Sequence, residues 1–159
     1  NERCFVRLLA DMRSYNYVIV ISQDFDRVQY RIRAIDFDQQ SYEGNPKVYK
    51  PQFLKENNAL VDMSLKVLAK ESIEQYEKEE RSLLAKRASS ERERLDDLLN
   101  CMKKDTISTL EKIKQLKLGL FKLTKDVKFK KSKNMGDVLS NGLDFVTRNY
   151  VFENPYIIK

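Results

Sequence analysis

The side chains that could carry out chemistry in this sequence are carboxylates, amides and amines, because its 159 residues include no histidine. The lack of His excludes Ser-His-Asp and Cys-His catalysis and histidine-ligated metal sites. Three polar residues then stand out by their positions: Asp11, Asn16 five residues later, and Asp36 at the end of an apolar segment. Two carboxylates and an amide that met in the fold would repel one another and favour a divalent cation.

A predicted β-hairpin connects these three residues. Residues 17–21 form a β-branched apolar run of strand length, and residues 28–37 alternate apolar and polar side chains, as a half-buried strand does. A polar, Asp-rich segment between them predicts a turn of about four to six residues. Because a hairpin returns the chain to its starting point, we expect Asp36 to lie beside Asn16.

The rest of the chain is predicted to be helical and to form one domain over residues 1–159. We expect an α+β, predominantly α fold, in which an N-terminal helix and the antiparallel hairpin pack on a helical bundle. The parts of this domain are a helix and hairpin (1–38), a loop (39–58) and a helical part (59–159). Apolar spacing predicts helices over residues 4–12, 59–104 with a break near Ser89–Ser90, 107–125 and 136–151.

The order of these motifs resembles the catalytic half of the protein-kinase-like phosphotransferases, the superfamily that includes HipA-type, lipid and aminoglycoside kinases. The resemblance rests on Leu-Ala-Asp-Met-Arg-Ser-Tyr-Asn ending at Asn16, on the hairpin, and on Ile-Asp-Phe-Asp ending at Asp38. It covers residues 8–38 and implies that the helical part is similar to a kinase-like C-lobe. Leu9 departs from the pattern, because His or Tyr is common at that position in the superfamily.

The resemblance implies a role for each matching residue. Asp11 would be the catalytic carboxylate that orients the acceptor hydroxyl, and Arg13 would contact the transferred phosphate. Asn16 and Asp36 would hold Mg²⁺, with ATP as the second cofactor. No Gly-rich loop or phosphate-binding Lys precedes these residues, so we expect a fragment that is inactive alone and whose partner is the missing N-terminal part of the same protein. The alternative is that these polar residues merely end a helix and two strands.

The second candidate feature is a lysine-rich strip. The net charge is +6, and residues 112–133 contain nine lysines and a single acid, Asp126. Such a strip can bind a polyanion, either nucleic acid or an anionic surface, or it can simply solvate a helix face. The absence of Arg from the strip weakens the case for nucleic acid. The candidate polyanion-binding residues are Lys122, Lys125, Lys128, Lys130, Lys131 and Lys133.

Two further observations bear on where the chain works and what it contacts. Cys4 and Cys101 do not make a disulfide framework, so we expect free thiols and a cytoplasmic location. No apolar run approaches the roughly 20 residues that a membrane span needs. An alternative to the phosphotransferase fragment is a helical module that binds a protein partner through its exposed faces.

Overall fold

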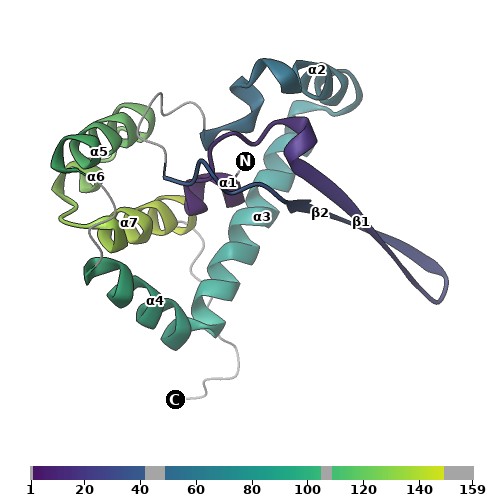
Figure 1. Cartoon of the computed structure of the whole chain (residues 1–159). Helices are drawn as coiled ribbons and strands as arrows, with labels where there is room; N and C mark the ends of the chain where they lie inside the picture. Colours follow the sequence, from purple (N-terminus) through teal and green to yellow (C-terminus); the bar gives the residue numbers. More distant parts are fainter. Residues whose placement is uncertain (1, 42–48, 105–108, 149–159) are drawn as a thin grey trace.

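The computed structural model describes residues 2–41, 49–104 and 109–148, which form a helical body with one projecting β-hairpin (Figure 1). The first elements are α1 (Glu2–Arg7), the 3₁₀ turn η1 (Ser14–Asn16), β1 (Tyr17–Asp24) and β2 (Arg27–Ala34). Later elements are η3 (Pro51–Phe53), η4 (Lys55–Asn57), α2 (Asn58–Val67), α3 (Lys70–Ser90), α4 (Arg92–Lys104), α5 (Leu110–Thr124), α6 (Lys128–Lys131) and α7 (Met135–Thr147). The predicted class, mainly helical with an antiparallel hairpin, is confirmed.

Helix α1 ends at Arg7, although apolar spacing predicts a helix over residues 4–12. Leu8 and Asp11 adopt left-handed φ angles of 52° and 58°, a conformation that L-residues do not sustain in a helix. Leu8 is only 1% exposed and Met12 is 0% exposed, so the apolar spacing correctly marks buried residues. The chain that carries Asp11 is thus a buried loop held between α1 and the hairpin.

Strands β1 and β2 pair in antiparallel register, from Tyr17 opposite Ala34 to Asp24 opposite Arg27. The turn between the strands has two residues, Phe25 and Asp26, and is shorter than expected. Phe25 adopts a left-handed φ of 43°, as the first central residue of a tight hairpin turn requires. The tight turn extends β1 from the predicted residue 21 to Asp24 and starts β2 at Arg27, but β2 ends at Ala34 and not at the predicted residue 37.

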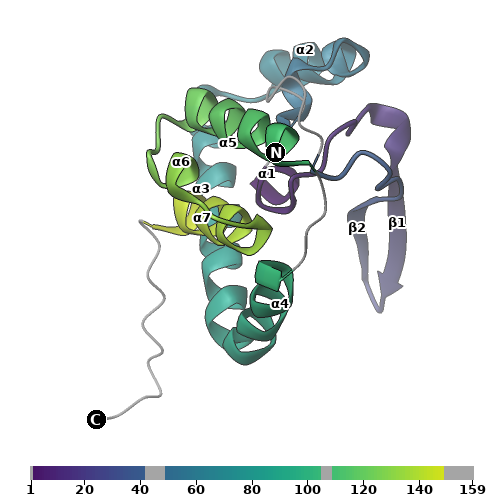
Figure 2. The ribbon, with the colours of Figure 1, turned by 60° about the vertical axis from the view of Figure 1, so that its left-hand side comes forward.

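The prediction that the hairpin packs on the bundle with one face half-buried is wrong. The hairpin projects from the helical body, as both views show (Figures 1 and 2). The side chains of Ile19, Ile21, Tyr30 and Ile32 share one face and are 64%, 65%, 69% and 68% exposed. Alternation correctly identifies an amphipathic strand pair, but in the described chain its apolar face remains open to solvent.

The region predicted as helix 59–104 forms three helices. Helix α3 ends at Ser90, which confirms the break predicted at Ser89–Ser90. A second break, not predicted, lies at Leu68 and Ala69, whose backbone is extended. Helix α5 lies within the range predicted at 107–125, and α7 begins near the predicted start; the last predicted helical residues, 149–151, lie outside the described chain.

The main core lies where α1, α5, α6 and α7 meet (Figure 2). Phe129 of α6 and Val138 of α7 are both 0% exposed. The ring of Phe5 contacts Phe129 edge-on, with 6.5 Å between centroids, and lies 5.8 Å from the ring of Phe145. Burial of these large apolar and aromatic side chains is the main force that holds the helices together.

Two further contacts fix α3 and α4 to this core. Arg81 of α3 forms an ion pair with Glu2 of α1, with 2.9 Å between Nε and Oε2. Helix α4 crosses α7 at Gly136, where an added Cβ would lie only 2.5 Å from the carbonyl oxygen of Leu99. The crossing therefore requires a residue without a side chain at this position.

Candidate functional site

The hairpin brings residues 35–41 back alongside residues 8–16. The Ile35 N–H donates to the Asn16 carbonyl at 3.1 Å, and the Ala10 N–H donates to the Gln39 carbonyl at 3.3 Å. Farther along, the Ser41 N–H donates to the Leu8 carbonyl at 2.8 Å. The chain therefore returns as the sequence suggests, and the segment that holds Asp36 follows directly from the hydrogen bond to Asn16.

Asp11 is held by Arg13. The Nη1 atom of Arg13 lies 2.8 Å from Oδ1 and 3.1 Å from Oδ2 of Asp11, whose side chain is only 12% exposed. Arg13 also donates to the Tyr15 hydroxyl at 3.0 Å, and its Nε lies 3.1 Å from Oε1 of Glu56, as an ion pair without hydrogen-bond geometry. The bond to Tyr15 and the charges of Asp11 and Glu56 raise the pKa of Arg13. In this structure the two proposed catalytic residues neutralise each other.

Asn16 is buried and supports the loop that carries Asp11. Its Nδ2 donates to the carbonyl oxygen of Asp11 at 2.7 Å, and its residue is 7% exposed. The side-chain N–H is thus used to close the five-residue loop, so the amide oxygen is the atom that remains suited to a cation. Asn57 has a similar supporting role, because its Nδ2 donates to the carbonyl oxygens of Met12 and Pro51 at 2.9 Å and 2.8 Å.

Asp36 forms a carboxylate pair with Asp38, a residue that the sequence analysis did not select. The Asp38 N–H donates to Oδ1 of Asp36 at 3.2 Å. The pKa of Asp38 is raised. The largest cause is desolvation, the next is its side-chain hydrogen bond with Asp36, and the negative charges of Asp36 and Asp11 add to it. The negative charges of Asp36 and, to a smaller extent, Asp11 therefore act on Asp38. The Asp-Phe-Asp spacing could have predicted that Asp38 lies beside Asp36, since residues two apart flank the same turn.

A Mg²⁺ site at these residues would have to take part of its coordination from nucleotide phosphates. The described part of the chain contains no group of three or more Asp, Glu or Cys side chains placed to enclose a metal ion. Mg²⁺ commonly takes one or two protein carboxylates and completes its shell with water and phosphate oxygens. Asp36 and Asp38, joined by the bond from the Asp38 N–H to Oδ1 of Asp36, are the two carboxylates that such a site could use.

The proposed polyanion-binding lysines lie along the end of α5, α6 and the start of α7. Lys125 caps α5 with a left-handed φ of 63°, and Lys130 stacks on Phe121, with its Nζ 3.7 Å from the ring centroid. Lys128 Nζ lies 3.4 Å from Oδ2 of Asp144. Two of the six candidate lysines are thus engaged with other side chains of the same region.

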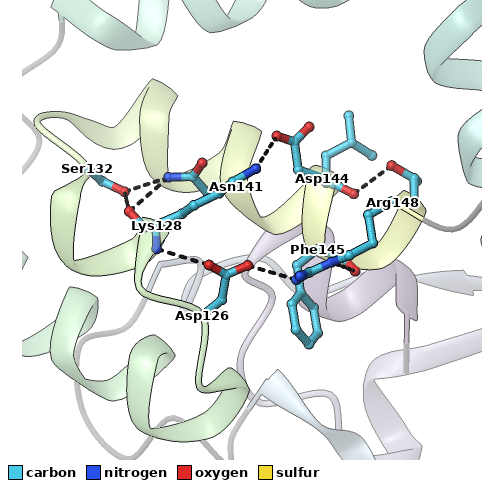
Figure 3. A network of polar contacts seen from close by, with 9 residues as sticks. Asp126, Lys128, Ser132, Asn141, Asp144, Phe145 and Arg148 are labelled. Atoms are coloured by element: carbon cyan, nitrogen blue, oxygen red, sulfur yellow. Dashed lines mark hydrogen bonds and ion pairs between the residues drawn. The ribbon is translucent and has the colours of Figure 1, made fainter.

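A polar network beside these lysines joins α6 to α7 (Figure 3). Asp126 accepts a hydrogen bond from the Lys128 N–H at 3.0 Å and pairs with Nη2 of Arg148 at 2.7 Å. The bond from the Lys128 N–H, followed by the nearby positive charges, lowers the pKa of Asp126. Asn141 donates to the Lys128 carbonyl at 3.2 Å and to Oγ of Ser132 at 2.9 Å. These contacts hold α6 and the turn before it against α7.

The network also dilutes the positive charge of the strip. Residues 122–148 contain six Lys and one Arg against three Asp, so their net charge is +4. A shallow pocket of about 210 Å³ opens here, and Asp137 lines it together with Lys128 and Lys131. Counting charge only up to residue 133 missed Asp137 and Asp144, which α7 places against the lysines.

Comparisons with protein families, characterised proteins and solved structures found no match for this chain. In the described ranges, no helix combines the length and the apolar character that crossing a membrane would require. The thiol prediction is confirmed: Cys4 is buried, Cys101 is exposed, and both are free.

Proposed function

We propose that this chain is the catalytic half of a kinase-like, ATP-dependent phosphotransferase and is inactive by itself. The observation that supports the proposal most is the antiparallel return of residues 35–41 alongside residues 8–16, which brings the segment that holds Asp36 and Asp38 back to the loop that holds Asp11. No Gly-rich phosphate loop occurs in the sequence. The part that binds the nucleotide would come from another segment of the protein.

In this proposal each side chain has a definite task. Asp11 accepts a hydrogen bond from the acceptor hydroxyl and orients it, which requires Arg13 to turn away from Asp11 toward the incoming phosphate. Asn16 keeps the loop closed through its bond to the Asp11 carbonyl. Asp36 and Asp38 hold Mg²⁺, which when bound would offset the phosphate charge. Positioning and charge neutralisation are the main demands of phosphoryl transfer, and none of these tasks needs histidine.

Binding of Mn²⁺, as a spectroscopic substitute for Mg²⁺, tests the metal site in this chain. Free Mn²⁺ is measured by electron paramagnetic resonance with and without ATP, and each reading is compared with a sample that contains the same ATP and no protein, because ATP itself binds Mn²⁺. We expect weak binding that ATP strengthens, because phosphate oxygens complete the coordination. Asp36→Asn should abolish the binding, whereas Asp26→Asn, at the tip of the hairpin, should leave it unchanged. Equal binding by both variants would reject the proposed site.

Phosphoryl transfer itself is tested with the chain joined to, or mixed with, the segment that binds the nucleotide. Asp36→Asn should abolish transfer, and Asp11→Asn should slow transfer while nucleotide affinity stays unchanged. Circular dichroism would establish that each variant keeps the parent fold. Transfer at the parent rate by both variants would mean that these residues only end structural elements.

A second candidate function, a protein-interaction module, is favoured by helix α2. Leu60, Met63 and Val67 repeat at helical spacing and are 49%, 56% and 76% exposed. No residue of α2 is buried in the described chain. An amphipathic helix with an open apolar stripe is the usual means of docking into a groove of another protein. Replacing Met63 with Lys would abolish such docking while leaving Mn²⁺ binding unchanged.

A further inference from the structure

The projecting hairpin, which we call the arm (residues 17–34), has an uneven distribution of charge. One face carries only uncharged side chains, those of Tyr17, Ile19, Ile21, Gln23, Val28, Tyr30, Ile32 and Ala34. On the other face, strand β2 contributes Arg27, Arg31 and Arg33, whereas β1 contributes a single charge, Asp24, next to the turn. The charges of the arm are therefore concentrated on β2 and at the tip.

The outer edges of the arm differ in the same way. The described sheet has two strands, so each strand has one edge without a strand partner. Natural edge strands usually carry charges, prolines or bulges that prevent pairing with another chain. Strand β2 has its three arginines, but residues 17–23 of β1 contain no charge, no proline and no glycine. Among the described residues, the edge of β1 thus has no strand partner and no feature that opposes strand addition.

The hydrogen-bond ladder shows which residues of β1 face this open edge. Opposite residues in an antiparallel pair alternate between exchanging backbone hydrogen bonds and not exchanging them. The Ile35 N–H donates to the Asn16 carbonyl, so Asn16 and Ile35 form a hydrogen-bonded pair. Because such pairs recur at every second residue, the even-numbered residues of β1 exchange backbone hydrogen bonds with β2. The N–H and C=O groups of Tyr17, Ile19, Ile21 and Gln23 consequently point outward.

We propose that a second copy of this chain pairs with the β1 edge in antiparallel register around a two-fold axis at Val20. This register sets Ile19 opposite Ile21 of the second copy and Tyr17 opposite Gln23. Every outward-facing residue then meets another outward-facing residue, and every pair is uncharged. β-Branched cross-strand pairs stabilise a sheet, and like charges opposite each other would oppose it.

A second copy is the occupant that fits this edge, because residues 17–23 pair with themselves without any charge opposite another residue. An isolated two-stranded hairpin is only marginally stable in water, and additional strands are needed to stabilise it. A second β1 edge converts two such hairpins into one four-stranded sheet with the order β2, β1, β1, β2 and arginines on both outer strands. This self-association is independent of the proposed phosphoryl transfer. We expect a reversible dimer, because weak and transient complexes are the ones with small interfaces and this pairing uses one strand of each copy.

Sedimentation equilibrium between about 5 and about 500 µM tests the proposal, because a small interface forms a dimer only at high concentration. Ile21 and Tyr30 form a matched pair: they are directly opposite each other, share a face and are 65% and 69% exposed. The parent should dimerise, Ile21→Lys should be monomeric, and Tyr30→Lys should still dimerise. A monomeric parent would overturn the proposal, and so would loss of dimer in Tyr30→Lys, which would indicate stacking of apolar faces.

A disulfide cross-link tests the register. In a Cys101→Ser background, Val20→Cys places two thiols opposite each other across the axis, about 4.5 Å apart at Cα, within disulfide range. Gln23→Cys lies opposite Tyr17 and has no such partner. We expect a covalent dimer from Val20→Cys alone under mild oxidation. Equal cross-linking of both variants, or of neither, would overturn the proposed register.

Discussion

Replacing Gly136 with alanine should destabilise the protein, because α4 and α7 touch at that residue. An added Cβ would lie 2.5 Å from the Leu99 carbonyl oxygen and 2.9 Å from Cγ of Lys103. The Lys103 side chain can move, but the carbonyl belongs to the α4 backbone. The two helices must therefore separate by about 0.5–1 Å to reach ordinary contact distance.

The size of the effect follows from two opposing terms. Overpacking of a tight contact costs about 1–3 kcal/mol, whereas replacing Gly with Ala in a helix contributes about 0.5–1 kcal/mol. We therefore expect Gly136→Ala to lower the free energy of unfolding by about 1–2 kcal/mol. For a chain of this length, each kcal/mol corresponds to about 2–4 °C in Tm.

Gly142, six residues later in the same helix, provides the matched control. A Cβ at this position would have no atom within 4 Å. Only the helix term acts there, so Gly142→Ala should raise the free energy of unfolding by about 0.5–1 kcal/mol. Urea unfolding followed by circular dichroism measures both variants. If Gly136→Ala were as stable as Gly142→Ala, the described crossing of α4 and α7 would be wrong.

Three other predictions follow from single contacts. Asp126→Asn should lower the free energy of unfolding by about 0.5–1 kcal/mol near neutral pH. The backbone N–H of Lys128 and the charge of Arg148 lower the pKa of Asp126, so its carboxylate stabilises the fold above the unfolded pKa of about 3.9. Urea titrations should therefore show the difference in unfolding free energy between parent and variant disappear as the pH falls below that value and through the lowered pKa of the folded state. Phe25→Gly should stabilise the hairpin by about 1 kcal/mol by relieving the left-handed backbone, seen as cross-strand nuclear Overhauser effects that persist to higher temperature. A thiol reagent should label Cys101 in the native protein and both Cys101 and Cys4 after denaturation, without reduction.

Local signals explain what the sequence could predict of the fold. The β-branched run and the alternating segment predict the hairpin, and two consecutive serines mark the end of α3. The break at Leu68 and Ala69 has no such signal, because Leu and Ala both favour helix. The sequence also could not predict that the arm is exposed. Alternation indicates that a strand has an apolar face, but it does not show which element covers that face.

The candidate site was predictable to a similar extent. Hairpin geometry alone places the end of β2 beside Asn16, and the structure has that contact. The sequence could not show that Arg13 turns back onto Asp11, because the left-handed φ of Asp11 creates that approach. It also could not show that α7 brings Asp144 to Lys128, since the two residues are sixteen positions apart and meet only when α6 packs on α7.

The isolation of the arm has a consequence for how the protein opens. Apart from its base, the arm is held mainly by contacts between β1 and β2 in the described part of the chain, whereas the helices of the body pack around a shared core. The strands can therefore separate without disturbing the helical core, as a unit with its own local unfolding free energy. Amide hydrogens of β1 and β2 should exchange with solvent far faster than those of α7, and the exchange of the arm should respond to protein concentration while that of the core does not.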